Sequence, residues 1–302
     1  MKYNSVVFSL LVAIIYFYSV IAQTKSDNCL KGPYLGQTLP NMTPEIFAPG
    51  IVSTDAWEAA GTFSPDGKEF FFTRRPTYEG SDNRIYYMYE SKEGWSVPDL
   101  ASFAQNCMEF EPHVSPDGKM LFYNSQRYFP EKKRRGSAIW RVLRKPRGWD
   151  ESNPLGSPIN DGFAMYVTST NRGDIYFTGS RNKKYGIFMS PLIDGKYTEP
   201  VYLPEEVNYL KGAHPFIAPD ESFLIFDSQA EGILKNSLYI SFHNPDGSWT
   251  KALKLPPAIN ATQTEMCPSL SPDGKFFFFH RTVDRNGEIF WVDAEILNTN
   301  KY

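Results

Sequence analysis

Short runs of aromatic residues, each preceded by a polar turn, dominate the pattern of this chain. The segment Phe63-Ser64-Pro65-Asp66-Gly67-Lys68 leads into the apolar run Phe70-Phe71-Phe72, and close copies of the turn begin at Ser115 and Ser271. Pro presets φ for a turn, Asp bonds to the backbone two residues on, and Gly tolerates a positive φ. Aromatic residues make up 16% of the chain, which favours strands. Since no long segment has helical periodicity, the pattern predicts β-hairpins closed by these turns.

The turn recurs about every 52 residues, at Ser64, Ser115, Ser169, Ala218 and Ser271. The third copy has lost the Pro-Asp-Gly sequence but keeps the apolar run after it. The first four copies each have four strand patterns, of which the fourth begins near an aromatic residue and ends at Asn106, Asn160, Asn208 or Asn260. A four-stranded unit repeated at this period is typical of a β-propeller. The sequence therefore predicts an all-β fold, a five-bladed β-propeller of four-stranded blades.

The fifth copy ends after its third strand, near Leu297, and lacks a fourth. A strand pattern at Phe47–Ser53 can supply it from the other end of the chain, because Pro49-Gly50-Ile51-Val52-Ser53 parallels Pro256-Pro257-Ala258-Ile259-Asn260. We expect this N-terminal strand to close the last blade, so that deletion of residues 46–53 would open the ring.

The repeated Ser-Pro-Asp-Gly-Lys turn followed by an aromatic strand resembles the WD40-like (PD40) repeat of exported bacterial propellers, which also occurs in TolB. The resemblance covers about residues 46–297. It implies a β-propeller that serves mainly as a binding surface. TolB has six blades and an additional N-terminal domain, for which this chain has no room, so the resemblance implies nothing about shared partners.

The N-terminus has the pattern of an export signal, with Lys2 followed by an apolar run from Val6 to Tyr18. We expect residues 1–22 to be a signal peptide cleaved before Gln23, residues 23–45 an irregular lead-in, and residues 46–302 a single β-propeller domain. The protein would then be periplasmic or secreted. Its net charge of −3, without a basic stripe, indicates no nucleic-acid partner. After cleavage we expect no membrane contact, and a monomer.

Export permits disulfides, but three cysteines, Cys29, Cys107 and Cys267, leave at least one unpaired, and whether two of them are joined stays open. Their spacing relative to the histidines matches no metal-binding pattern. The chain contains no phosphate loop, nucleophile elbow or His-Glu-x-x-His motif. The sequence thus predicts neither a metal nor another cofactor.

Candidate binding residues emerge when the first strands are aligned on their turns. Six positions before the turn residue lie Glu58, Glu109 and Glu265, and four positions before it lie Ala60, Glu111, Met165, His214 and Cys267. Side chains alternate along a strand, so these positions should share a face toward the central channel. The ends of the second strands add four arginines. The predicted channel-mouth site consists of Glu58, Glu109, Glu111, His214, Glu265, Arg74, Arg127, Arg181 and Arg281. We expect His113 to point away from the channel.

Two interpretations of these residues stay open. They could form a polar ligand pocket, or each Glu could pair with an Arg and tie the repeats together, as residues found in most repeats usually do. Glu111 and His214 break the repetition and are therefore favoured for a specific role. The leading function is non-catalytic recognition of a protein, peptide or glycan at the channel mouth. The alternative is a carbohydrate-active enzyme, a glycoside hydrolase or lyase, that uses channel-facing Glu residues.

Overall fold

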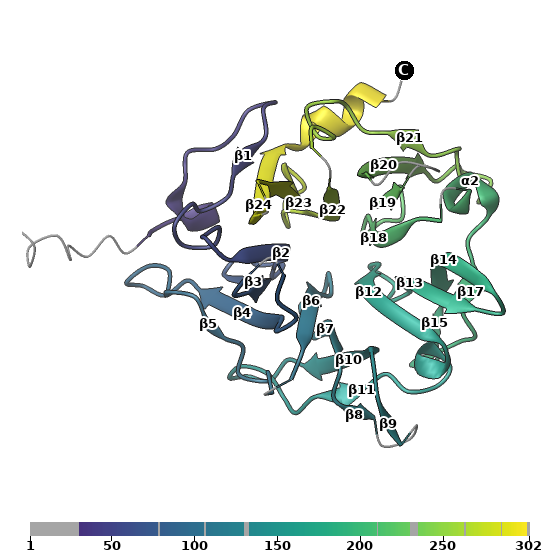
Figure 1. The fold of residues 1–302 in the computed structure, drawn as a ribbon. Coiled ribbons are helices and arrows are strands. Elements are labelled where there is room, and N and C mark those ends of the chain that lie inside the picture. Colours follow the sequence, from purple (N-terminus) through teal and green to yellow (C-terminus); the bar gives the residue numbers. More distant parts are fainter. Residues whose placement is uncertain are drawn as a thin grey trace, which may run out of the picture.

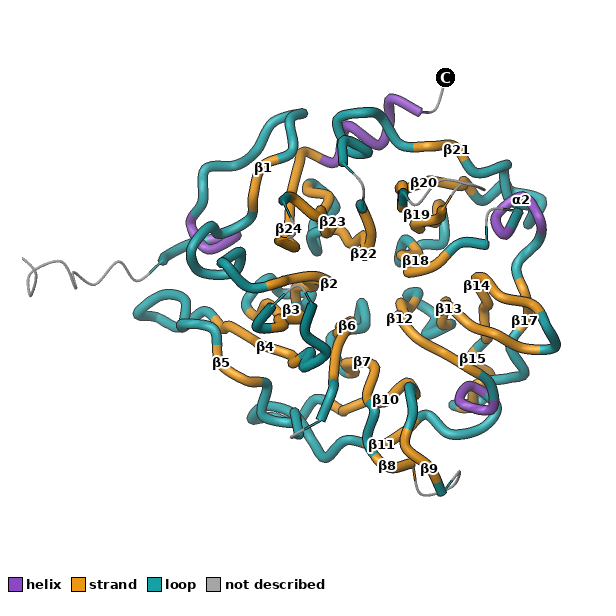
Figure 2. The backbone as a smooth tube through the Cα atoms, in the orientation of Figure 1, coloured by secondary structure: helices purple, strands orange, loops and turns teal. Residues whose placement is uncertain are grey.

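The computed structural model describes residues 30–77, 79–105, 107–129, 133–209, 211–229, 235–262, 264–284 and 286–300. The predicted signal peptide, Cys29 and Asn106 lie outside the described residues. Strands gather around the middle of the molecule and loops lie toward its outside (Figure 2). The helical elements are short: η1 (Pro33–Gly36), η3 (Ile159–Asp161), α2 (Glu205–Asn208) and η4 (Ala294–Asn300). In the described part of the chain, no helix has the length and apolar character needed to cross a membrane.

Each repeat folds into antiparallel strands that follow one another outward from the centre of the molecule (Figure 1). Repeat 1 comprises β2 (Trp57–Phe63), β3 (Glu69–Arg75), β4 (Arg84–Tyr89) and β5 (Asp99–Leu100). Repeat 2 comprises β6 (Glu109–Val114), β7 (Met120–Ser125), β10 (Ala138–Leu143) and β11 (Asn153–Pro154). Repeat 3 comprises β12 (Phe163–Ser169), β13 (Ile175–Arg181), β14 (Lys184–Ser190) and β17 (Val201–Tyr202).

Repeat 4 comprises β18 (Ala213–Ile217), β19 (Phe223–Gln229), β20 (Asn236–Phe242) and β21 (Leu253–Lys254). Repeat 5 comprises β22 (Glu265–Leu270), β23 (Phe276–Val283) and β24 (Asn286–Asp293). Two small hairpins, β8–β9 (Tyr128–Phe129, Arg134–Arg135) and β15–β16 (Leu192–Ile193, Lys196–Tyr197), lie outside this pattern. A single parallel contact, Trp57 with Gly287, joins the sheets of repeats 1 and 5. Sheets arranged radially around an axis are the architecture of a β-propeller. We call β2, β6, β12, β18 and β22 the inner strands.

The Ser-Pro-Asp-Gly segments are turns held by their own side chains. Ser64 donates its hydroxyl to Asp66 Oδ1 at 2.6 Å, and the backbone N–H of Lys68 donates to the same oxygen at 3.1 Å. The turns at Ser115 and Ser271 have the same bonds. Gly67 has a φ of 70°, which a residue with a side chain rarely adopts. The aspartates of this repeat therefore serve the hairpin.

The turn of repeat 3 lies one residue later than the sequence alignment predicted. Thr170, and not Ser169, makes the backbone bonds that Ser64 makes in repeat 1, to Asp174 and from Gly173. The turn of repeat 3 is one residue shorter than that of repeat 1, since Thr170 bonds to Asp174 whereas Ser64 bonds to Glu69. An alignment that assumes turns of equal length therefore places its first residue one position too early. The residue equivalent to Glu111 is consequently Tyr166, and not Met165.

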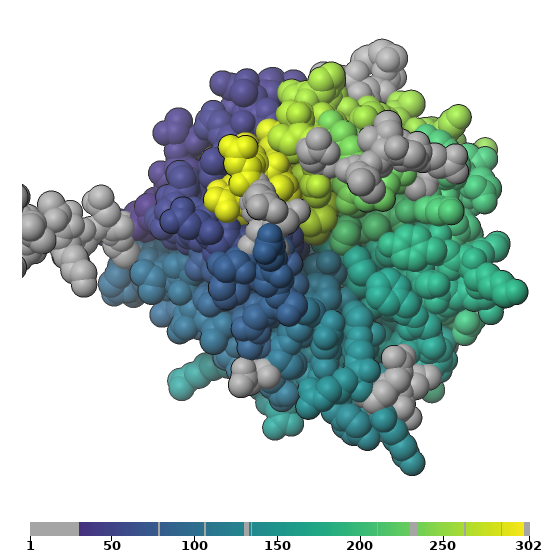
Figure 3. Space-filling model, in the orientation of Figure 1, coloured from purple at the N-terminus to yellow at the C-terminus, as the bar shows by residue number. Residues whose placement is uncertain are grey.

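The N-terminal segment adds a strand to repeat 5, but not where the sequence pattern placed it. β1 (Glu45–Ile46) pairs antiparallel with β24, whereas residues 47–53 form a turn in which the backbone N–H groups of Ile51, Val52 and Ser53 donate to Ala48 O. Pro49 and Gly50 favour a turn over a strand. In the space-filling view, the purple N-terminal part of the described chain borders the yellow C-terminal part (Figure 3).

The predicted parallel between residues 49–53 and 256–260 extends to hydrogen bonds. Asn160, Asn208 and Asn260 each donate to and accept from the backbone of one residue in the third strand of the preceding repeat. Ser53 makes the corresponding pair of bonds to Ile289 in β24. The N-terminal turn thus occupies, on repeat 5, the place that an Asn-containing turn occupies on repeats 2, 3 and 4.

Phe47 anchors this segment, and its replacement should weaken the whole fold. Its fully buried ring packs edge-on against Phe70, Phe278 and Trp291, at centroid distances of 5.1 to 5.2 Å. We expect Phe47→Ala to lower the free energy of unfolding by about 3–5 kcal/mol, measured by chemical denaturation. Ile46→Ala, at a neighbouring site that is 38% exposed, is the control and should cost far less. Equal losses for the two variants would contradict this role.

Glu288 on β24 should make stability depend on pH. Burial, with repulsion from Glu58 and Asp55, raises the pKa of Glu288 to about 7. A pKa above its unfolded value means that the fold loses stability as pH rises from about 4.5 through 7. Glu288→Gln should therefore stabilise the protein at pH 8, on the order of 1 kcal/mol after allowance for solvent screening, and not at pH 4. Melting temperatures at both pH values test this, with exposed Glu151→Gln as the control.

Candidate functional site

The inner strands do not alternate regularly, because each carries a β-bulge near its middle. The pairing registers shift within 59–62, 110–113, 165–167, 213–216 and 266–269. In each bulge one residue has a φ between 45° and 59°, and we call these the bulge residues: Ala60, Glu111, Tyr166, His214 and Cys267. A bulge adds one residue to the strand, so side chains before and after it exchange faces.

Polar side chains of the preceding repeat hold three bulge residues by their backbone. The N–H of Glu111 donates to Thr73 Oγ1, and that of His214 to Thr178 Oγ1, each at 2.8 Å. The N–H of Cys267 donates to the carboxylate of Asp227. These bonds offset part of the cost of a left-handed backbone, about 1–2 kcal/mol per residue.

The bulge side chains meet at the axis of the molecule. Ala60, Tyr166 and Cys267 belong to one buried cluster. The Tyr166 ring meets the His214 ring edge-on, with centroids 5.0 Å apart. One ligand atom each of Glu111, His214 and Cys267 lies within 4.8 Å of the other two, so this group could hold a metal ion. Sequence spacing could not indicate it, because its members come from three repeats.

His214 lies between two carboxylates. Its Nδ1 is 2.7 Å from Asp227 Oδ1, and its Nε2 is 3.4 Å from Glu111 Oε1. Burial disfavours the imidazolium, but the charges and hydrogen bonds of Asp227 and Glu111 outweigh it and raise the pKa of His214 to about 10. In the metal-free protein His214 is therefore a charged donor and no general base.

Two of the other three polar bulge residues, Cys267 and Tyr166, are held neutral. Burial raises the pKa of the Cys267 thiol well above its usual value, so that without a cation it is a poor nucleophile. Burial likewise raises the pKa of Tyr166, whose hydroxyl donates to Pro268 O at 2.8 Å. Only Glu111 has an unsatisfied polar atom here, since its buried Oε2 has no hydrogen-bond partner.

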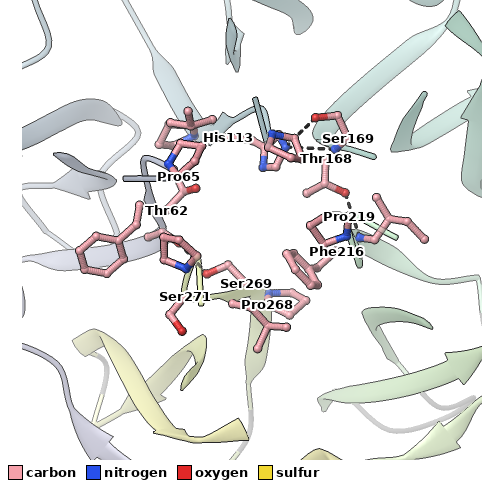
Figure 4. A pocket seen from close by; sticks show the side chains of 18 of the residues that line it. Thr62, Pro65, His113, Thr168, Ser169, Phe216, Pro219, Pro268, Ser269 and Ser271 are labelled. Carbon is pink, nitrogen blue, oxygen red and sulfur yellow. Dashed lines mark hydrogen bonds between the residues drawn. The ribbon is translucent and has the colours of Figure 1, made fainter. Parts of the chain in front are cut away.

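A cavity of about 260 Å³ opens from this cluster toward the Ser-Pro-Asp-Gly turns. Residues from all five inner strands and their turns surround it, and Figure 4 shows them as a ring around an open centre. Glu111 and Tyr166 line its deep end, because they precede the other lining residues on their strands. The outer wall consists mainly of turn prolines and small polar residues, including Pro65, Pro219, Thr62 and Ser269.

His113 lines this cavity, contrary to the prediction that it points away from the channel (Figure 4). Because the bulge lies between Glu109 and His113, these two side chains lie on opposite faces of the strand, and His113 is the one that faces the cavity. Its Nε2 accepts the backbone N–H of Ser169 at 3.0 Å. Burial lowers the pKa of His113 to about 3, so the ring is neutral and joins repeats 2 and 3.

Among the predicted site residues, the structure brings together Glu111 and His214. Glu58, Glu109 and Glu265 are 0% exposed and lie away from the cavity. Each pairs with the arginine of its own repeat, at 2.8 Å to Arg74, 2.5 Å to Arg127 and 3.3 Å to Arg281. The same three arginines, and Arg181, donate to backbone carbonyls of the segment that enters their repeat.

Sequence reasoning missed Asp227 and gave no role to Cys267 or Tyr166. Asp227 could have been found as the one carboxylate within the aromatic run Phe223–Gln229 of repeat 4. Cys267 has the same position relative to its turn as Glu111 and His214 have to theirs. This shared position was the signal in the sequence that the three side chains lie close together. Tyr166 was hidden by the shortened turn of repeat 3.

The buried Glu–Arg pairs should matter for stability. Arg127→Ala would leave Glu109 buried and unpaired, and we expect a loss of about 3–5 kcal/mol in the free energy of unfolding. Lys119→Ala, which breaks an exposed pair with Asp117, should cost less than about 1 kcal/mol. Urea denaturation of both variants measures the two losses. A small loss for Arg127→Ala would argue against a structural role for the pair.

No family model matches this chain, and neither does any curated protein. Solved structures do. A GH43 endo-arabinanase from Bacillus licheniformis aligns with a TM-score of 0.51 at 13% identity, over 85% of this chain and 96% of that one. An α-L-arabinofuranosidase from Lactobacillus brevis has a TM-score of 0.48 at 14% identity, over 79% and 89%. Kuenenia stuttgartiensis hydrazine synthase has 0.44 at 16%, over 76% and 57%. Identities this low show the fold alone, and the fold is a β-propeller.

Proposed function

We propose that this chain is an exported propeller of the WD40-like (PD40) repeat type, which binds a small ligand in the axial cavity without turnover. In this proposal residues 46–302 form one domain of five blades, and strand β1, which begins one residue earlier at Glu45, closes the ring. The mature protein is a periplasmic or secreted monomer that contacts neither nucleic acid nor membrane.

The observation that supports ligand binding is the unpartnered carboxylate oxygen of Glu111. A buried acceptor without a donor is costly, on the order of 1–3 kcal/mol, and a ligand donor at the deep end of the cavity would remove that cost. Among the described residues that line the cavity, Glu111 is the one with a carboxylate. The other polar groups around it, at His113, Thr168 and Ser269, already bond to neighbouring repeats.

The lining indicates the kind of ligand. A volume of about 260 Å³ is just below the range of about 300–1,000 Å³ that is usual for drug-sized ligands. Proline rings and Phe216 offer apolar faces, while Glu111 offers one strong acceptor. A neutral group with both hydroxyls and C–H faces, such as the end of a glycan, suits this lining. The end of a peptide or of a protein segment is the other ligand that we consider.

Arrays of glycans and peptides, probed with the purified protein, test the proposal. A hit should lose at least about tenfold in affinity with Glu111→Gln, because a hydrogen bond to a charged acceptor is worth about 1.5–3 kcal/mol. Thr62→Phe, which fills the cavity and leaves Glu111 in place, should also weaken binding. Exposed Glu205→Gln is the matched control. The proposal fails if neither array gives a hit, or if all three variants bind alike.

A carbohydrate-active enzyme is the second candidate function, and the same carboxylate favours it. The endo-arabinanase and the arabinofuranosidase compared above are enzymes of this class. Hydrolysis of a glycoside normally uses two carboxyl groups, and a lyase needs a single base. Product analysis after incubation with an array hit separates the two functions. Turnover that Glu111→Gln abolishes would favour the enzyme, and binding without product would favour recognition alone.

A further inference from the structure

We propose that Glu111, His214 and Cys267 form a zinc site at the axis of the molecule, at the deep end of the cavity. Zinc binding is tested without a cavity ligand, because the ligand proposed above would use the same Glu111 oxygen. The inference rests on the convergence of three ligand types, on a carboxylate that orients two of the three residues, and on an unsatisfied oxygen within the group.

The geometry is close to that of a zinc site. One ligand atom from each of the three residues lies within 4.8 Å of the other two. Zinc takes thiolate, imidazole and carboxylate ligands at about 2.0–2.3 Å, which places the ligand atoms of a tetrahedral site roughly 3.3–3.8 Å apart. A contraction of roughly 1 Å would therefore complete the site. Side-chain rotation can supply this, and all three residues are held near the axis by their bulges.

Asp227 provides the supporting contacts that zinc ligands commonly have. Its Oδ1 lies 2.7 Å from His214 Nδ1, which leaves Nε2 directed toward Glu111. Its carboxylate also accepts the backbone N–H of Cys267. A carboxylate that binds the outer nitrogen of a histidine fixes the tautomer and orientation of a metal ligand. One buried side chain thus orients two of the three proposed ligands.

The group also offers an unsatisfied acceptor. Glu111 is 9% exposed, and its Oε2 has no hydrogen-bond partner. A cation bound by Glu111, His214 and the Cys267 sulfur would satisfy that oxygen and offset negative charge in this buried group. The thiolate ligand favours zinc over Ca²⁺ and Mg²⁺, which prefer oxygen ligands.

Binding can be written with its protons balanced. Zinc displaces the proton of the Cys267 thiol and the Nε2 proton of His214, while the Nδ1 proton stays on His214 and is donated to Asp227. Two protons leave as one Zn²⁺ enters. Three protein ligands leave a fourth position, as in zinc sites that bind water or substrate. Since Glu111 and Tyr166 line the cavity, that position would be accessible from it.

Metal binding to the purified, chelator-treated protein tests the site. We expect one equivalent of Zn²⁺ per chain by competition with a chromophoric chelator. Co²⁺ should give a thiolate-to-cobalt charge-transfer band in the near ultraviolet. Cys267→Ala should abolish that band and weaken Zn²⁺ binding at least 100-fold. Glu111→Gln should also weaken binding, and Asp227→Asn should do so by about 10- to 100-fold.

Cys107→Ala is the matched control, because Cys107 is also a free cysteine but lies beside Glu109 and Ser125, outside the group. It should keep both the cobalt band and the zinc affinity. Circular dichroism of each variant shows whether it is folded. If Cys267→Ala does not fold, Glu111→Gln provides the test of the site. The proposal is overturned if the folded wild-type protein binds no Zn²⁺ at micromolar concentration. It is equally overturned if metal binding survives both Cys267→Ala and Glu111→Gln.

Discussion

The hydrogen bond from the backbone of a bulge residue to a side chain of the preceding repeat sets the geometry at the centre of this molecule. It holds the backbone at Glu111, His214 and Cys267, whose side chains converge at the axis. A left-handed residue other than glycine costs about 1–2 kcal/mol, so it persists only where its surroundings fix it. At three of the five bulges, the backbone N–H is fixed by a hydrogen bond to the side chain of Thr73, Thr178 or Asp227.

This constraint divides the polar residues of the inner strands into two sets. Before the bulge, Glu58, Glu109 and Glu265 repeat, and each completes an ion pair within its own repeat. At the bulge, no two residues are alike. Repeated residues serve the contacts that every repeat must make, whereas a different residue at each equivalent position can build an asymmetric site. The axis is therefore where this fold has room for a specific function.

The sequence was sufficient for the β-propeller fold, because its strands and turns are encoded locally. The Ser-Pro-Asp-Gly turns hold themselves through their own side chains, and the aromatic runs are the second strands. The candidate site was harder to predict. A bulge is a departure from regular alternation, which period-two counting cannot include, and so Glu58, Glu109 and Glu265 were assigned to the channel side. The N-terminal strand was misplaced within its segment because its pairing with β24 is long-range.

One position on the second strand of each repeat faces the bulge of the next repeat, and repeat 4 is the repeat with a carboxylate there. In each repeat this position pairs with the residue just before the bulge, and it holds Thr73, Asn124, Thr178, Asp227 and His280. Thr73 and Thr178 show that a neutral hydroxyl is enough to bind the backbone. Burying a carboxylate at this position instead costs more free energy, and only a charged or hydrogen-bonding partner offsets that cost. Asp227 pairs with the imidazole of His214. A buried ion pair therefore lies at the axis, beside the point where the carboxylate, imidazole and thiol ligand types meet.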